Sequence, residues 1–277
     1  MFIQEKTKIK VLGFLFLATI IVWVFVFAEV DDDILEIDFF DVGQGDGIFI
    51  EFNGKYMLID GGPSNAILDK LGTETPFYKR KLDVVLLTHP EYDHITGLIE
   101  VIKRYDIGAI ITTGVVRDTN QYEEFLNVIK DIPLYIAQYG GEIDFNGVEF
   151  NILYPFESLA GQKVSNTNNS SIVGRLVYNN FKVLFTGDIE KSVERKLLDL
   201  DLQTDVLKVA HHGSKTSSTE EFLKAVDSVL NVISAGKDNK YGHPHQEVLE
   251  RMTVDVFVTG KSGDLEILSD GMFFKRN

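Results

Sequence analysis

The sequence contains no cysteine. This absence excludes disulfide bonds, thiolate metal ligands and a cysteine nucleophile, so any bound metal must be held by nitrogen and oxygen atoms. It leaves the cellular compartment open, because a chain without cysteine is stable in both oxidising and reducing surroundings. Repeats of fixed period and long linkers are also missing, which favours one continuous domain over an array of small ones.

Positive charge is also in short supply. Lysine and arginine number 27 against 42 aspartates and glutamates, a net charge of −15. Residues 1–28 have a net charge of +2, which leaves −17 for the remainder. Because phosphate backbones are bound by clustered lysine and arginine, this balance argues against tight binding of a long nucleic acid. A local basic pocket or a metal ion could still attract a phosphate.

One long apolar run without charge covers residues 11–28. Eighteen residues at helical rise extend about 27 Å, close to the thickness of a bilayer's hydrocarbon core. Three lysines precede the run and a cluster of acidic residues follows it. This charge asymmetry predicts that the chain after the run lies outside the cytoplasmic membrane.

Two interpretations of this segment remain open. It is either a signal anchor that stays in the membrane or a signal peptide cleaved after Ala28, and its length favours the anchor. We therefore expect an N-terminal segment at residues 1–29 and one domain at residues 30–277. The domain would be membrane-anchored on the extracytoplasmic side, or secreted if residues 1–28 are removed.

The remainder of the chain predicts many short strands with a few helices between them. Strands are expected at 34–40, 47–52, 55–60, 82–88, 107–114, 134–138, 142–145, 148–154, 172–178, 181–185, 206–210, 229–234, 254–258, 264–268 and 272–274. Helices are expected at 95–105, 120–130, 189–200 and 219–226. This pattern favours an α/β fold in which two sheets pack together and helices cover the outside.

All six histidines follow expected strands. They fall in the segments THPEYDH, AHHGS and GHPH. Side chains at the ends of strands are where α/β sheets present their sites, so this clustering indicates a functional site. The histidines are His89, His94, His211, His212, His243 and His245.

Carboxylates accompany these histidines. His89, Asp93 and His94 lie within six residues, directly before a helix, and imidazole with carboxylate binds Zn²⁺, Mn²⁺ or iron. Asp188 ends the strand segment LFTGD, where one carboxylate could bridge two metal ions. Asp60, in LIDGG, is expected to be structural, with its carboxylate bound to backbone or to a ligand histidine.

In this order, the motifs DVGQGD, LIDGG, THPEYDH, TGD, HHGS and GHPH resemble those of the metallo-β-lactamase superfamily. More narrowly, they are similar to the C-terminal metallo-hydrolase domain of the ComEC DNA-uptake competence family. The resemblance extends from about Ile34 to Gly271. It implies an αββα sandwich with a site for one or two divalent metal ions at one edge of the sheets.

The resemblance also implies roles for individual residues. His89 would bind the first metal, Asp93 and His94 the second, and Asp188 would bridge the two. His243 would complete the second site. His211 and His212 would line the site, as ligands or as donors to a phosphate oxygen, and they join Asp93 as the candidate catalytic residues.

Two positions depart from the superfamily pattern. Glu91 stands where a histidine is usual, and Asn169 aligns with another ligand histidine of many members. Competence-type domains favour an acidic residue at the first position and an Asn/Ser motif at the second, so both departures support the narrower resemblance. Glu91 then becomes a candidate oxygen ligand, and Mn²⁺ is plausible beside Zn²⁺.

The sequence therefore predicts a metal-dependent hydrolase, either a phosphodiesterase or a nuclease, that acts outside the cytoplasmic membrane. Analogy ranks single-stranded DNA from DNA uptake first, whereas the acidic chain fits a small phosphodiester better. β-Lactam or lactone hydrolysis is less favoured, because those sites usually keep the full histidine set. The candidate phosphate-binding residues are Asn169, Ser170, Ser214 and Lys240.

Two alternative functions belong to other classes of protein. The departures at Glu91 and Asn169 would also fit a non-catalytic, metal-stabilised module that docks on a membrane complex. A serine hydrolase could use HHGS with Asp188, but the chain lacks the GxSxG turn that exposes such a nucleophile.

Overall fold

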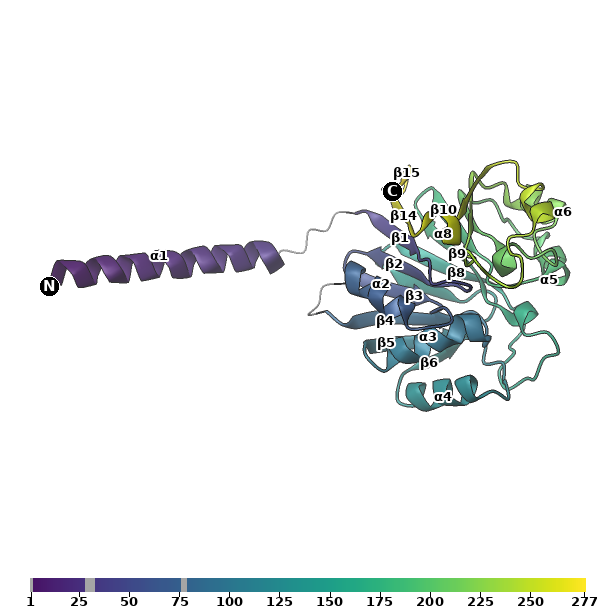
Figure 1. The fold of residues 1–277 in the computed structure, drawn as a ribbon, viewed down its shortest axis with the longest axis horizontal. Coiled ribbons are helices and arrows are strands. Elements are labelled where there is room, and N and C mark those ends of the chain that lie inside the picture. Colours follow the sequence, from purple (N-terminus) through teal and green to yellow (C-terminus); the bar gives the residue numbers. More distant parts are fainter. Residues whose placement is uncertain (1, 28–32, 76–78) are drawn as a thin grey trace. The chain divides into compact units, whose positions relative to one another are not determined.

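The computed structural model describes residues 2–27, 33–75 and 79–277, in two units, Met1–Asp32 and Asp33–Asn277 (Figure 1). The first unit contains helix α1 (Phe2–Phe27). Across the described residues, no helix is both long and apolar enough to span a bilayer, so the expected membrane-spanning segment is not supported. The expected cleavage site after Ala28 lies outside the described residues.

The second unit contains two sheets. Among the described residues, the first has eight strands in the order β15 (Phe274–Arg276), β14 (Leu265–Ser269), β1 (Leu35–Phe39), β2 (Ile48–Phe52), β3 (Lys55–Ile59), β4 (Lys81–Leu87), β5 (Asp106–Thr112) and β6 (Leu134–Ile136). The second has seven in the order β13 (Asp255–Val258), β12 (Leu230–Ile233), β11 (Val206–Lys208), β10 (Phe181–Phe185), β9 (Val173–Tyr178), β8 (Val148–Tyr154) and β7 (Glu142–Phe145).

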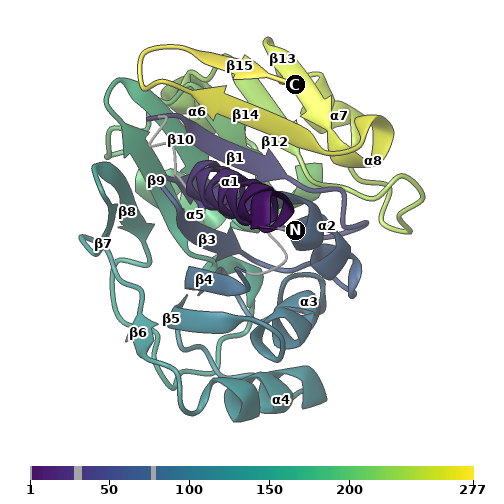
Figure 2. The ribbon, with the colours of Figure 1, turned by 90° about the vertical axis from the view of Figure 1, so that its left-hand side faces the viewer.

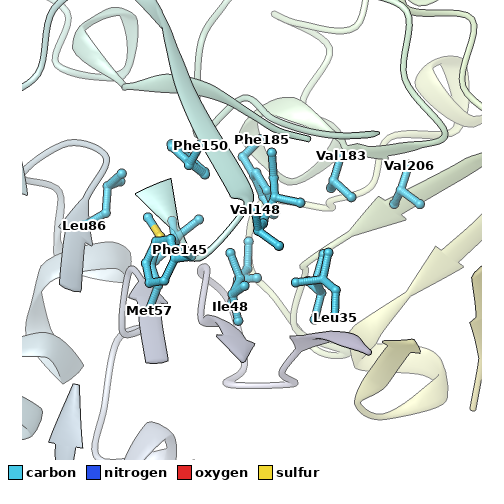
Figure 3. Packing of buried hydrophobic residues seen from close by; sticks show 14 of the residues in the cluster. Leu35, Ile48, Met57, Leu86, Phe145, Val148, Phe150, Val183, Phe185 and Val206 are labelled. Atoms are coloured by element: carbon cyan, nitrogen blue, oxygen red, sulfur yellow. The ribbon is translucent and has the colours of Figure 1, made fainter. Parts of the chain in front are cut away.

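The two sheets pack face to face over a single apolar core (Figure 3). Alternate residues of β1, such as Ile37 and Phe39, point into this core because successive side chains of a strand face opposite sides. The Phe39 ring stacks on Phe185 of the second sheet with 6.2 Å between centroids. Strands from both halves of the chain thus contribute side chains to one shared apolar core.

Helices cover the outer faces of the sheets (Figures 1 and 2). Helices α2 (Ala66–Glu74), α3 (Tyr92–Ile102) and α4 (Asn120–Ile129) pack on the first sheet, and α5 (Lys191–Leu197) and α6 (Glu220–Val226) on the second. The shorter helices are η1 (Asn168–Ser170), η2 (Ala210–Gly213), α7 (Gln246–Leu249) and α8 (Thr259–Ser262). The expected αββα sandwich is confirmed.

Local signals located most of these elements. The hairpins at Asn53–Gly54 and Asn179–Asn180 join paired strands as expected. Helix α2 was not expected, because only Ile67 and Leu71 of its nine residues are buried and the apolar period is weak. Helix α3 begins at Tyr92 rather than Ile95, which places Asp93 and His94 in its first turn.

Candidate metal centre

The strand ends gather the site residues at one edge of the two sheets. Strands β10, β11 and β12 are parallel neighbours, so the segments that follow them emerge on the same side. Asp188 follows β10, and the 3₁₀ turn η2 follows β11 with His211 and His212. His89 follows β4 of the other sheet. The edge of the sandwich therefore unites motifs that are far apart in the sequence.

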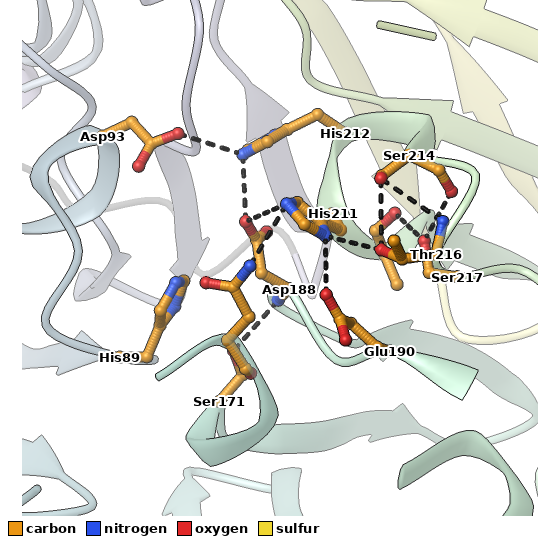
Figure 4. A network of polar contacts seen from close by, with 12 residues as sticks. His89, Asp93, Ser171, Asp188, Glu190, His211, His212, Ser214, Thr216 and Ser217 are labelled. Carbon is orange, nitrogen blue, oxygen red and sulfur yellow. Dashed lines mark hydrogen bonds and ion pairs between the residues drawn. The ribbon is translucent and has the colours of Figure 1, made fainter. Parts of the chain in front are cut away.

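Three imidazole rings, those of His89, His94 and His212, surround the Asp188 carboxylate, and Figure 4 shows His89 and His212 beside it. The Nε2 atoms of His94 and His212 lie 3.4 Å and 3.3 Å from Asp188 Oδ2. His89 joins His94 and Asp188 in a group whose ligand atoms all lie within 4.8 Å of one another. The four side chains are buried.

A neighbouring group fixes the other nitrogen of each ring. His94 Nδ1 lies 2.7 Å from Asp60 Oδ2, and His212 Nδ1 lies 2.7 Å from the Ser234 carbonyl oxygen. The Thr88 hydroxyl donates to Asp60 Oδ2, so it accepts from His89 Nδ1 at 3.0 Å. These partners would keep a proton on Nδ1 of each ring and leave Nε2 to face the site as a ligand, the arrangement found behind metal-bound histidines. Asp60 occupies the supporting position expected from its sequence.

The atoms that point into the centre have no hydrogen-bond partner. Within the described residues, this holds for Nε2 of His89, His94 and His212 and for Asp188 Oδ1, all of which are buried. An unsatisfied buried polar group costs about 1–3 kcal/mol, so four together need a partner. A nitrogen and oxygen set of this kind fits Zn²⁺ or Mn²⁺.

The electrostatics of the cluster favour positive charge. Burial opposes protonation of His94 and His212, but Asp188 and the carboxylates behind the rings outweigh it and raise both pKa values. Burial and the neighbouring His94 lower the pKa of His89 to about 3. A divalent cation bound among these carboxylates would supply the charge that protons otherwise provide.

Asp93 and His211 lie at the accessible side of the centre. Asp93 Oδ2 is 3.4 Å from His212 Nε2, and its side chain is 26% exposed. His211 Nε2 is 3.9 Å from Asp188 Oδ2. His211 and His212 have φ values of 51° and 55°, a left-handed conformation that non-glycine residues rarely adopt. Strain of this kind is concentrated at functional sites.

Three predicted ligands or contacts have other partners. Glu91 pairs with Arg117 at 2.8 Å and belongs to none of the candidate metal groups of described residues. Asn169 Oδ1 accepts the Glu190 N–H, and the Ser170 hydroxyl donates to the Thr167 carbonyl oxygen. Glu91 is thus paired with Arg117, and the Asn169 and Ser170 side chains make local backbone contacts, while the roles predicted for these three residues at the site stay predictions.

The late motifs lie around His211. The buried Ser214 hydroxyl lies 3.1 Å from Thr216 Oγ1, which lies 3.2 Å from His211 Nδ1. His243 has its ring centroid 5.6 Å from that of His211 and is in none of the candidate metal groups of described residues. Lys240 is exposed, with Nζ 5.1 Å from the Tyr241 ring centroid. Ser214 supports His211 through Thr216, whereas His243 borders the centre.

The sequence did not single out three residues that the structure places here. Asp46 Oδ1 lies 3.4 Å from His212 Nδ1, Asn168 Nδ2 lies 3.2 Å from His211 Nε2, and Ser171 Oγ accepts the Asp188 N–H. The carboxylate that ends DVGQGD was a usable signal for Asp46. No sequence signal distinguished among the four adjacent polar residues at 168–171, because the directions of their side chains depend on the turn η1.

Comparisons with known proteins agree with this geometry. Residues 40–237 match the family model described as "Metallo-beta-lactamase superfamily". ComE operon protein 3 of Bacillus subtilis is 30% identical over 257 residues, 83% of this chain and 32% of the relative. Competence protein ComA of Neisseria gonorrhoeae is 30% identical over 236 residues, 82% of this chain and 31% of the relative. The chain spans about a third of the length of these curated relatives.

Solved structures support the fold. The metallo-β-lactamase fold protein YhfI of Bacillus subtilis superposes with a TM-score of 0.55 at 15% identity, covering 80% of this chain and 96% of that one. A long form RNase Z from yeast gives 0.50 at 12% identity, covering 84% and 42%. The motif order, the sandwich, the buried histidine cluster and the family match lead to one conclusion. The chain belongs to the metallo-β-lactamase superfamily, and the resemblance to competence proteins is confirmed.

Proposed function

We propose that this member of a metal-dependent hydrolase family cleaves phosphodiesters, with single-stranded DNA as the first candidate substrate. The observation that supports it best is the convergence of three partnerless Nε2 atoms on the Asp188 carboxylate. A metal-stabilised docking module would also use these atoms, but it would have no need for the partly exposed Asp93 and His211 beside them. We therefore rank that alternative second.

The site offers ligands for one or two ions. His89, His94 and Asp188 form one group, and Asp93, His94 and His212 form a second that overlaps it. A divalent ion held there supplies Lewis acidity toward phosphate oxygens and lowers the pKa of water. Because the two groups share His94, and Asp188 Oδ2 lies 3.3 Å from His212 Nε2, they are close enough for either occupancy.

The surrounding residues have separate tasks in this proposal. Asp93, at the accessible side, orients the attacking water and accepts its proton. His211 lines the phosphate position, because its Nε2 lies 3.9 Å from Asp188 Oδ2 and its side chain is 19% exposed. Asn168 Nδ2 donates to the same Nε2 atom of His211, and Thr216 Oγ1 contacts Nδ1 on the other side of the ring. Asp60 and Ser234 keep the ligand rings in position.

The charge distribution limits the substrate. Lys208 is buried against Asp46, so it is unavailable to a phosphate, while Lys215, Lys237 and Lys240 are exposed near the late motifs. These few lysines suit a short or single-stranded phosphodiester better than a long duplex. The names of the relatives, competence and recombination proteins, support DNA as the polymer to test first.

The place of action is part of the same proposal. The charge asymmetry around residues 11–28 favours action outside the cytoplasmic membrane. Protease treatment of intact and of lysed cells that express the tagged chain tests this prediction. Degradation of the domain in intact cells would support it, and protection until lysis would contradict it.

The decisive experiment measures bound metal and phosphodiesterase activity of the purified full chain. Bis-p-nitrophenyl phosphate and single-stranded DNA serve as substrates after addition of Mn²⁺ or Zn²⁺. Asp188→Ala should lose both metal and turnover, and Asp93→Asn should lose at least a hundredfold in turnover, within the range typical of a general base. Asp118→Asn, a change of a 76% exposed carboxylate, is the control and should match the unmodified chain.

The outcomes separate the alternatives. Metal-dependent turnover that both site variants abolish would establish a hydrolase. Bound metal without turnover on either substrate would favour the metal-stabilised docking module instead. Turnover on the small ester but not on DNA would retain the phosphodiesterase and remove the nuclease.

A further inference from the structure

A second group of carboxylates lies on the other face of β1, away from the apolar core. Leu35, Ile37 and Phe39 point into that core, so Glu36 and Asp38 point to the opposite side of the sheet. Glu74, the last residue of α2, approaches them there. One oxygen from each of Glu36, Asp38 and Glu74 lies within 4.8 Å of the others.

The central member of this group is a buried carboxylate without a partner. Asp38 is 4% exposed, and its Oδ2 atom has no hydrogen-bond partner. Within the part of the chain that the structure describes, no lysine, arginine or histidine forms an ion pair with Glu36, Asp38 or Glu74. The lysine of α2, Lys70, is bound to Asp264 instead, at 2.7 Å. Burying an uncompensated carboxylate is costly, so this arrangement needs a positive partner or a proton.

A residue of the neighbouring strand β14 increases the need for a positive partner or a proton at Asp38. Asp38 stands directly opposite Glu266 of β14 in the antiparallel register, and like charges at such positions destabilise a sheet. Burial, with Glu36 and Glu74, raises the pKa of Asp38 to about 9. The electrostatic environment of Asp38 thus strongly favours neutralisation.

We infer that Glu36, Asp38 and Glu74 form a second cation site, separate from the histidine centre, for a hard divalent cation of the calcium class. The donors are carboxylate oxygens only, a set that Ca²⁺ prefers, whereas Zn²⁺ sites usually include nitrogen or sulfur. Glu36 and Glu74 are only partly buried, so water can complete the coordination shell.

The proposed cation site lies between two segments that support the histidine centre. Strand β1 leads into the loop that ends at Asp46, and α2 follows the loop that begins at Asp60. A cation bound by residues of β1 and α2 connects the two segments that support His212 and His94. Its binding would stabilise the frame of the metal centre without contributing a ligand to it.

The test is thermal unfolding of the purified full chain, loaded with Zn²⁺ and then titrated with Ca²⁺ alone. Ca²⁺ should raise the Tm by roughly 5–10 °C at a hundredfold excess over its Kd. Asp38→Asn should lose this shift, yet melt above the unmodified chain in calcium-free buffer, because asparagine is buried neutral without taking up a proton on folding. Glu149→Gln, at an exposed strand carboxylate of the second sheet, should keep the full shift.

Two further variants keep the test decisive. Glu74→Gln changes only the helix end and should lose the shift even if Asp38→Asn fails to fold. Asp188→Ala should retain the shift, which separates this site from the histidine centre. The inference is overturned if Ca²⁺ up to about 10 mM, above the weakest Kd typical of calcium modules, leaves the Tm unchanged. A shift that persists in both Asp38→Asn and Glu74→Gln would also overturn it.

Discussion

Lys208 Nζ lies 2.8 Å from Asp46 Oδ2, and the two side chains are 1% and 2% exposed. The lysine ends β11 of the second sheet, and the aspartate belongs to the loop after β1 of the first. Burial opposes ionisation of Asp46, but Lys208 and His212 outweigh it and lower its pKa. The pair connects the two sheets through charge and holds a carboxylate behind His212.

Lys208→Met should destabilise the fold strongly, because it leaves the Asp46 charge buried without its partner. Loss of one member of a buried pair typically costs about 3–5 kcal/mol. Asp46→Asn with Lys208→Met should recover most of that loss, since neither charge remains. Urea denaturation of the single and double variants measures the free energies of unfolding. Additive losses in the double variant would show that the pair does not act as a unit.

Asp60→Asn should weaken metal binding while the chain stays folded. Asp60 accepts from Thr88 and contacts His94 Nδ1, so its carboxylate fixes the ring that presents Nε2 to the centre. Loss of such a supporting carboxylate typically costs 10–100-fold in metal affinity. Competition with a chromophoric chelator measures the affinity, with Asp118→Asn as the control. Equal affinities in the two variants would contradict the supporting role.

Glu91→Gln should leave the metal stoichiometry unchanged, because Glu91 pairs with Arg117 and lies outside the candidate metal groups of the described residues. His94→Ala, in the same motif, should lose metal, since His94 belongs to both of the groups proposed to hold ions. Elemental analysis of the purified variants measures the stoichiometry. Loss of one equivalent in Glu91→Gln would instead support the predicted ligand role of Glu91 and require rotation of its side chain away from Arg117.

The stability of the calcium-free chain should fall as pH rises. The pKa of Asp38 is about 9 in the folded chain against 3.8 for an ordinary aspartate, so between these values only the folded chain keeps the proton. The unfolded chain then binds fewer protons, and the free energy of unfolding decreases with pH. The slope from one such group is at most about 1.4 kcal/mol per pH unit.

Asp38→Asn removes this contribution and provides the measurement. Both chains are denatured in the presence of a chelator between pH 5 and 8. The free energy of unfolding of the variant should increase relative to that of the unmodified chain as pH rises. Glu149→Gln, at an exposed carboxylate, should follow the unmodified chain throughout. Parallel curves for Asp38→Asn and the unmodified chain would exclude a raised pKa at this position.

The sequence by itself determined most of the elements and the fold class, although helix α2 was missed. The alternation of apolar residues, the Asn53–Gly54 turn and the clustering of histidines after strands are local features, set within a few residues of one another. Turn and strand preferences act over such short spans, so two packed sheets with a site at the strand ends could be expected from them. The candidate ligand histidines could be named because their motifs follow strands β4 and β11.

Only the tertiary structure decided which polar atoms meet. Asp60 reaches His94 across 34 positions of the chain, and Arg117 reaches Glu91 across 26. Asn168, rather than Asn169, faces His211, because the turn η1 directs adjacent side chains to different sides. The carboxylates Glu36, Asp38 and Glu74 meet only once α2 packs on the sheet. These contacts depend on strand register, helix packing and side-chain direction, which no local periodicity specifies.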